Sequence, residues 1–211
     1  MELLCFNELA STQTYLLEAL RKKELSVPIA ITAKEQTAGI GSRDNSWEGG
    51  SNNLFFSLAL NLNDLPKDLP LSSASIYFSI FMKDILKEYS SDVWLKWPND
   101  IYQNQSKIGG TITKKIDNIL VCGMGINLQK SQNGFEALNI NIEPIVLLEK
   151  YLFALEKYPS WKQQFSQYRV EFGRNKDCFA HVAGEYKSLK DAILSEDGSI
   201  ILDKKRVYSL R

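Results

Sequence analysis

Apolar segments with the length of buried strands are interleaved irregularly with helical segments along this chain. The strand-like segments lie at residues 27–32, 54–60, 93–96, 108–113 and 119–126. Short apolar runs of this kind are typical of strands inside a domain. Because helices do not follow each strand in turn, the order favours an α+β domain with one mixed β-sheet over a doubly wound parallel fold.

Four segments are expected to form helices. Residues 71–89 are the clearest, because Tyr77, Phe81, Ile85 and Tyr89 recur every four residues and make one apolar face. The other helical segments cover residues 15–20, 145–158 and 161–172.

The C-terminal part of the chain has a different character. Residues 176–211 contain short strand-like runs and a turn at Asp197 and Gly198, which predicts a small β module. A chain of 211 residues is long enough for one ordinary domain and such an appendage. We therefore expect a main domain at residues 1–175 and a module at residues 176–211.

Charge and cysteine content exclude several classes of protein. Lys plus Arg and Asp plus Glu are 25 each, and this balance argues against a basic nucleic-acid binder. The three cysteines, Cys5, Cys122 and Cys178, form no CxxC pair, so neither a disulfide framework nor a zinc ribbon is indicated. No apolar run approaches the roughly 20 residues that span a bilayer. A cytoplasmic protein without a membrane partner is expected.

Three clusters of residues carry the chemistry. The first, residues 36–47, has two glycines that let the backbone approach a ligand, together with a fixed cation and an aromatic ring. The second joins residues 96–101 to residues 107–110 and places two lysines, a carboxylate and a carboxamide around a turn. The third, residues 123–128, is a strand that ends in glycines and an amide. No P-loop motif occurs.

Together these clusters resemble the motifs of the biotin protein ligase family, also called biotin–[acetyl-CoA-carboxylase] ligases. The family's GRGRxGRxW loop corresponds to residues 39–47, and its KWPND block is intact at residues 96–100. The K(I/L)(A/G)G segment is found at residues 107–110, and GxGIN at residues 123–127. Ser11, Thr12 and Gln13 stand for an early Ser-Thr-Asn. The match covers nearly the whole chain.

The resemblance implies a fold, a reaction and partners. The fold is the class II synthetase-like catalytic fold of biotin and lipoate ligases, followed by a shortened SH3-like module. The reaction joins biotin to ATP as biotinyl-5′-AMP, with Mg²⁺, and then transfers biotin to a lysine of the biotin carboxyl carrier protein of acetyl-CoA carboxylase. Because the Ser-Thr-Gln element begins at residue 11, a monofunctional ligase without a DNA-binding domain and without a specific DNA partner is expected.

The resemblance also assigns roles to residues. Lys107 and Arg43 would neutralise the reacting anions, and Asp100 would either orient or deprotonate the incoming lysine or fix the turn. The residues expected to bind biotin are Ser11, Thr12, Gln13, Gln36, Gly39, Gly41, Lys107, Gly109 and Gly110. Those expected to bind the nucleotide are Ile40, Ser42, Arg43, Trp47, Asn99 and Asn127. No protein metal site is assigned, since Mg²⁺ would be held mainly by ATP, with Asn99 as the one side chain considered for it.

This chain departs from the family pattern within the glycine-rich loop. Ile40 and Ser42 stand where the family has arginines, so Arg43 is the only cation among residues 39–47.

Two other functions are weighed against this one. A lipoate–protein ligase uses a related fold, and a single-stranded nucleic-acid module would use Trp47, Trp94 and Trp97 as stacking platforms.

Overall fold

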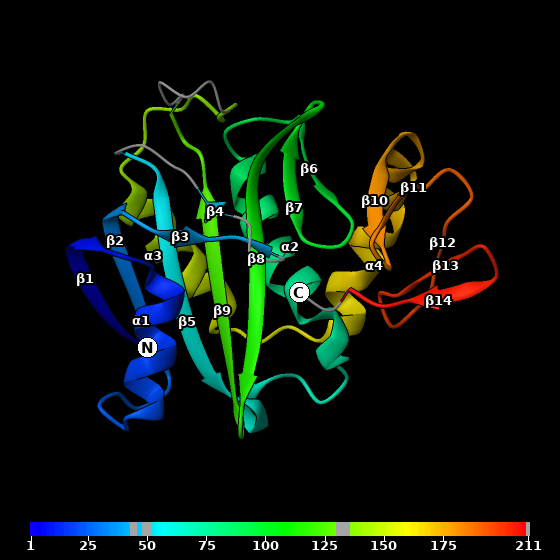
Figure 1. Ribbon diagram of the computed structural model, residues 1–211. Coiled ribbons are helices and arrows are strands. Elements are labelled where there is room, and N and C mark those ends of the chain that lie inside the picture. The colour runs from blue at the N-terminus through cyan, green and yellow to red at the C-terminus, as the bar shows by residue number, and fades with distance from the viewer. Residues whose placement is uncertain (43–45, 48–51, 130–135, 210–211) are drawn as a thin grey trace.

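A seven-stranded mixed β-sheet forms the centre of the molecule (Figure 1). The computed structural model describes residues 1–42, 46–47, 52–129 and 136–209. The strand order is β1-β2-β5-β9-β8-β7-β6, with β1 and β2 parallel and every other neighbouring pair antiparallel. These strands are β1 (Glu2–Leu9), β2 (Ile29–Gln36), β5 (Leu54–Asn61), β6 (Val93–Lys96), β7 (Asp100–Gln103), β8 (Ser106–Ile116) and β9 (Ile119–Ile126). The expected α+β class with one mixed sheet is confirmed.

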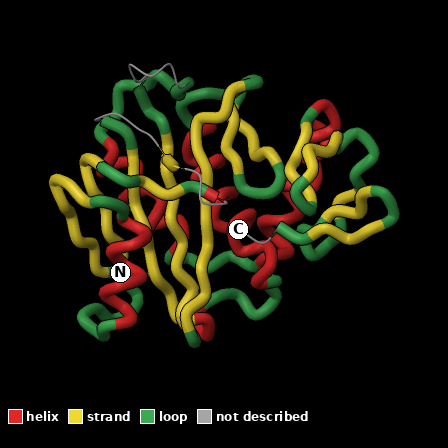
Figure 2. The backbone as a smooth tube through the Cα atoms, viewed as in Figure 1, coloured by secondary structure: helices red, strands yellow, loops and turns green. Residues whose placement is uncertain are grey.

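Helices cover both faces of this sheet, as the tube in Figure 2 shows. Helix α1 (Thr12–Arg21) lies on one face against β2, β5 and β9, while α2 (Ala74–Lys87) and α3 (Pro144–Leu155) lie on the other. Helix α4 (Trp161–Glu171) packs beside α2. All four predicted helices are therefore confirmed.

The alternation of side chains along β5 and β9 explains this two-sided packing. On β5, Leu54, Phe56, Leu58 and Leu60 belong to the core beneath α2 and α3, whereas Ala59 belongs to a smaller core beneath α1. Successive side chains of a strand point to opposite faces, so an almost continuous apolar run is needed when both faces are covered.

Helix α2 is buried nearly all round rather than along one face. Tyr77, Phe81 and Ile85 are buried as expected, but so are Ile76, Phe78 and Ile80 on the other sides. Tyr89 lies past the helix end and is exposed. The period of four residues identified the helix correctly and underestimated how much of it is covered.

Two strands of the central sheet were not predicted, and neither were two short strands in the glycine-rich stretch. Both β1 and β7 are absent from the strands expected in the sequence. Within residues 35–53, which show little periodicity, two short strands, β3 (Gly39–Ile40) and β4 (Ser46–Trp47), pair antiparallel.

The small C-terminal β module is present as five short strands. They are β10 (Phe179–Val182), β11 (Glu185–Ser188), β12 (Ile193–Leu194), β13 (Ile200–Leu202) and β14 (Lys205–Val207), which form one two-stranded and one three-stranded sheet. A 3₁₀ segment, η4 (Phe172–Asp177), joins them to α4. The boundary at residue 175 stays a prediction. Within the described ranges, no helix is long and apolar enough to cross a membrane.

Candidate active site

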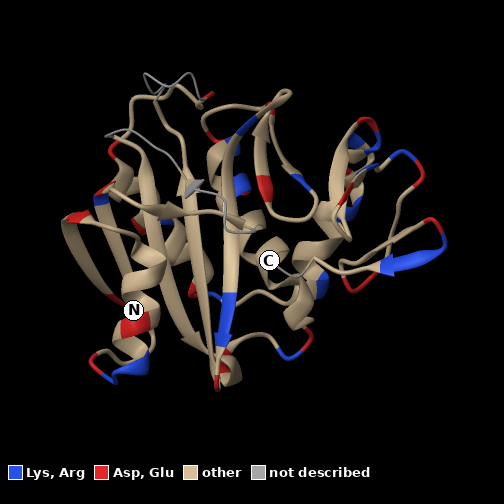
Figure 3. Cartoon of the chain, in the orientation of Figure 1, with Lys and Arg blue, Asp and Glu red and all other residues tan. Residues whose placement is uncertain are grey.

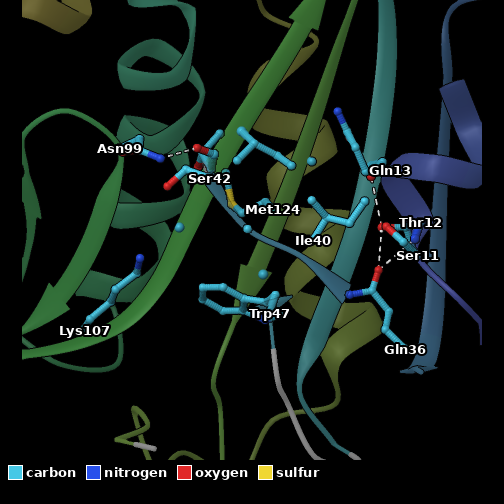
Figure 4. Close-up of a pocket in the computed structure, with 17 residues that line it drawn as sticks. Ser11, Thr12, Gln13, Gln36, Ile40, Ser42, Trp47, Asn99, Lys107 and Met124 are labelled. Carbon is cyan, nitrogen blue, oxygen red and sulfur yellow. Dashed lines mark hydrogen bonds between the residues drawn. The ribbon is translucent and has the colours of Figure 1, made fainter. Parts of the chain in front are cut away.

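A cavity of about 90 Å³ lies on the α1 face of the sheet, where β9 carries glycines (Figure 4). On β9, Cys122, Met124 and Ile126 belong to the core on the opposite face, so Gly123 and Gly125 fall on the α1 face. Since neither glycine has a side chain, the sheet surface is hollow at this place. The cavity is smaller than the roughly 300–1,000 Å³ of typical small-molecule sites.

Hydroxyl and amide groups line one side of this cavity. Ser11 caps α1 by accepting the Thr14 N–H, and the turn brings Thr12 against β5 and β2. The Ser57 hydroxyl donates to Thr12 Oγ1 at 3.0 Å, and Thr12 donates through its N–H and Oγ1 to Gln36 Oε1 at 2.7 and 3.1 Å. Thr12 is 3% exposed and Ser57 is fully buried, so this chain of neutral hydrogen bonds is shielded from water.

Trp47 forms a further wall of the cavity. A methyl group on Gly125 would come within 2.6 Å of the indole Nε1, so the ring packs directly on the β9 backbone. Strand pairing holds Gly39 opposite Trp47, and a methyl group there would meet the Trp47 carbonyl at 2.4 Å. Gly39 is therefore needed for the close pairing of β3 with β4, and Gly125 for the close approach of the Trp47 ring to β9.

Two buried polar atoms of the cavity walls have no hydrogen-bond partner among the described residues. They are Gln13 Oε1, an acceptor beside Gly123, and Trp47 Nε1, a donor beside Gly125. Buried polar groups of native proteins are normally satisfied, so a ligand or a water molecule in this cavity would supply the missing partners.

The turn between β6 and β7 brings charged groups to the opposite wall. Asn99 is 4% exposed, and its side-chain Nδ2 donates to the Thr111 backbone carbonyl at 2.6 Å. The backbone carbonyl of Asn99 accepts the Thr111 N–H at 3.0 Å. Asp100 Oδ1 lies 2.7 Å from Lys107 Nζ, and this ammonium is 5.6 Å from the centre of the Trp47 ring. The turn is thus fixed by Asn99, while Asp100 pairs with Lys107.

Lys96, at the start of this turn, is half-buried. Burial opposes its charge, but the Tyr102 hydroxyl at 3.2 Å and the nearby Asp100 carboxylate together keep the pKa of Lys96 above its usual value. Lys96 therefore stays protonated through the neutral range.

A second cleft of about 180 Å³ continues from the cavity towards the C-terminal strands. It shares Ser42, Asn99 and Lys107 with the first and adds Asp100 together with residues of β10 and β11. Lys107 and Asn99 therefore stand between two openings.

The structure brings most of the predicted residues together. Those that line the cavity are Ser11, Thr12, Gln13, Gln36, Ile40, Gly41, Ser42, Trp47, Asn99, Lys107 and Gly110. Asp100 lines the second cleft, while Gly39, Gly109 and Asn127 line neither opening. Arg43 lies outside the described residues.

Several lining residues were not assigned a role from the sequence. They are Ser57, Thr111, Ile112, Gly123, Met124 and Gly125. Ser57 had a visible signal, since it is the only polar residue in the apolar run at residues 54–60.

The nucleic-acid interpretation finds no support at the tryptophans. Trp94 and Trp97 are 5% and 1% exposed, so neither presents a ring face on which a base can stack. In the described part of the chain, basic and acidic residues are interspersed over the visible face (Figure 3).

Comparison with known protein families decides the affiliation. The model of the biotin/lipoate A/B protein ligase family matches residues 5–131. This chain belongs to that family. The match includes α1, the glycine-rich stretch, the β6–β7 turn and β8–β9, so it covers every wall of the cavity.

Sequence comparison with individual proteins finds relatives that are named as ligases. The bifunctional ligase/repressor BirA of Escherichia coli is 32% identical over 125 residues, which are 56% of this chain and 38% of that protein. Biotin–protein ligase 2 of Arabidopsis thaliana is 31% identical over 118 residues, 52% of this chain and 36% of that protein. The chain thus spans little more than a third of the length of these relatives.

Solved structures extend the likeness to the whole chain. The biotin acetyl coenzyme A carboxylase synthetase from Helicobacter pylori, with bound biotinylated ATP, has a TM-score of 0.93 and 44% identity, covering 98% of this chain and 99% of that one. The biotin protein ligase from Aquifex aeolicus in complex with biotin and ATP has a TM-score of 0.79 at 21% identity, covering 100% and 96%, and supports the fold.

Proposed function

We propose that this protein is an ATP-dependent biotin–protein ligase. It would activate biotin as biotinyl-5′-AMP and transfer the biotinyl group to a lysine of the biotin carboxyl carrier protein of acetyl-CoA carboxylase. The observation that carries the proposal is the likeness, at 44% identity over nearly both chains, to a synthetase with bound biotinylated ATP. The polar cavity with two orphaned hydrogen-bonding atoms supports it independently.

In the first step, a carboxylate oxygen of biotin attacks the α-phosphorus of ATP and pyrophosphate leaves. Both reactants are anions, so a cation between them lowers the repulsion and stabilises the charge that develops on the phosphoryl oxygens. Lys107 is suited to this role because its ammonium lies at the junction of the two openings. The neutral network of Ser57, Thr12 and Gln36 offers donors and acceptors of the kind that a ureido ring requires.

In the second step, the ε-amine of the carrier lysine attacks the acyl carbon and AMP leaves. The amine must first lose a proton, and Asp100 is the candidate acceptor because it lines the opening towards β10 and β11. The ion pair between Asp100 and Lys107 would have to open so that Asp100 can accept a proton from the ε-ammonium of the carrier lysine.

The proposal also includes Mg²⁺ as the ion that accompanies ATP and the cytoplasm as the location of the protein. The described residues contain no group of three or more His, Cys, Asp or Glu side chains that suits a metal ion. We therefore place Mg²⁺ on the phosphates of ATP and derive no step through a protein-bound metal. A cytoplasmic location agrees with the three free cysteines.

Pyrophosphate release and product mass test this function together. The purified protein is incubated with MgATP and either biotin or lipoate, and then with a biotin carboxyl carrier domain. We expect pyrophosphate and a mass of biotinyl-AMP with biotin alone, followed by one biotinyl group on the carrier lysine. Turnover with lipoate in place of biotin would identify a lipoate ligase instead.

A further inference from the structure

The turn that carries Asn99 and Asp100 lies at the edge of the sheet. It follows β6, the last strand, which pairs with β7 on one side only. Leu95 and Trp97 are 0% and 1% exposed, so water cannot satisfy the backbone groups that point away from β7. Such groups need a partner from elsewhere in the protein.

Asn175 of η4 supplies this partner. Its Oδ1 accepts the Trp97 N–H at 2.7 Å, and its Nδ2 donates to the Leu95 carbonyl at 3.4 Å. In a parallel pair of strands, a residue that lies opposite residue i of its neighbour donates its N–H to the carbonyl of residue i−1. Its own carbonyl accepts the N–H of residue i+1. The carboxamide of Asn175 makes the same two bonds around Lys96 and thus replaces one residue of a missing strand.

We propose that Asn175 is a positioning residue for the adenylation chemistry, an inference that rests on the proposed function. Asn175 is fully buried and does not line the cavity, so it acts through the turn. By holding the backbone at Trp97, it fixes the start of the turn whose end carries Asn99 and Asp100. Asp100 in turn pairs with Lys107.

The biotin side of the cavity is built independently of Asn175. Thr12 and Gln36 are held by each other and by Ser57 of β5, through hydrogen bonds in which η4 takes no part. Loss of Asn175 should therefore lower kcat for adenylation and leave KM for biotin nearly unchanged.

Hydrogen exchange tests the structural part of the proposal without any catalytic assay. In Asn175→Ala, the Trp97 amide should exchange at least tenfold faster than in the wild type, relative to the amides of α3. The control is Leu155→Ala, which removes a fully buried side chain of α3 and lowers Tm without touching the turn. A Trp97 amide as protected in Asn175→Ala as in the wild type would overturn the proposal.

Steady-state kinetics test the functional part. For Asn175→Ala we expect kcat of pyrophosphate release to fall at least tenfold and KM for biotin to change less than threefold. Asn175→Asp keeps an acceptor for the Trp97 N–H but sets a buried carboxylate oxygen against the Leu95 carbonyl, so its kcat should fall at least as far as that of Asn175→Ala. Asn175→Ser, which is small and neutral, serves as the test variant if the alanine variant does not fold. If Asn175→Ala and Leu155→Ala have the same Tm and lose the same amount of kcat, the role of Asn175 is merely structural. A wild type that releases no pyrophosphate refutes the ligase function, whereas the exchange result still reports on the turn.

Discussion

Lys107 brings a positive charge to the junction of the two openings. Its ammonium pairs with Asp100 and faces the Trp47 ring, yet the side chain is 40% exposed. An ion pair this exposed contributes about 1 kcal/mol or less to stability. Stability therefore explains this residue poorly, which agrees with the role in phosphoryl transfer that we propose for it.

Lys107→Ala should abolish most adenylate synthesis and keep the fold. Loss of one electrostatic contact to a developing charge costs about 3 kcal/mol, a rate loss of roughly a hundredfold or more. Lys115→Ala is the matched control, because Lys115 is an exposed lysine of the same strand, β8. Pyrophosphate release and Tm are measured for both. Near-normal release by a folded Lys107→Ala would remove Lys107 from the mechanism.

Ser42 lines both clefts where the family pattern has an arginine. A serine hydroxyl offers an anionic phosphate one hydrogen bond, whereas an arginine offers two parallel hydrogen bonds and a positive charge. We expect Ser42→Arg to slow the release of biotinyl-AMP and to lower the labelling of bystander proteins, with little change in carrier biotinylation. Biotin incorporated into an added non-substrate protein measures this. Equal labelling by wild type and variant would mean that another group, such as Arg43, already retains the adenylate.

At this scale the sequence predicted the residues of the site that stand in motifs and missed one that strand pairing supplies. Residues such as Asn99 and Lys107 stand in motifs whose spacing is visible along the chain. Ile112 stands in none of these motifs and reaches the cavity only through its pairing with Gly123 of β9.

Among the elements, strands with many buried residues were predictable, including the edge strand β6, and strands with few buried residues were not. Strand β5 is buried along nearly its whole length, so its sequence is continuously apolar. Strand β1 has no buried residue, and β7 has one, since both depend on pairing rather than on apolar composition. Their partners, β2 and β8, are distant or joined through turns whose pairing the sequence does not specify.

The contact between β4 and β9 depends on the missing side chain of Gly125. In Gly125→Ala, the new methyl group would lie within 2.6–2.9 Å of the Trp47 ring, so the indole must move outwards. Acrylamide quenching detects this, because Trp94, Trp97 and Trp161 are all at most 5% exposed. We expect a larger quenchable fraction in Gly125→Ala.

Gly173→Ala provides the control for this measurement, since a methyl group there meets nothing within 4 Å. Quenching of Gly173→Ala should equal that of the wild type. Identical quenching in both alanine variants would show that the indole does not depend on Gly125.

At the scale of the whole molecule, the turn between β12 and β13 ties the C-terminal strands to the main domain. Its carbonyls accept hydrogen bonds from three side chains: Ser73 Oγ to Asp197 at 2.5 Å, Trp97 Nε1 to Gly198 at 2.9 Å and Trp161 Nε1 to Glu196 at 2.9 Å. These donors come from the start of α2, the β6–β7 turn and α4. We therefore expect both parts to unfold together, although composition places a boundary at residue 175.

Two glycines with similar positive φ angles test this coupling. Gly198 has φ +78° and Gly184 has φ +87°, so alanine at either position costs about 1–2 kcal/mol for the left-handed conformation. A methyl group on Gly198 would also meet Ser73 Oγ at 2.5 Å, whereas one on Gly184 meets nothing within 4 Å. Overpacking of this kind adds about 1–3 kcal/mol.

Gly198→Ala should therefore lower the free energy of unfolding by about 2–5 kcal/mol and Gly184→Ala by about 1–2 kcal/mol, as urea denaturation measures. The transition of each variant should remain single, because the carbonyls of the 196–198 turn hold donors from three elements of the main domain. If both variants lose the same free energy of unfolding, the 196–198 turn accommodates the methyl group without a measurable loss of stability. An early separate transition in Gly198→Ala would instead make residues 176–211 an independently unfolding unit, and the boundary expected from the sequence would then be a physical one.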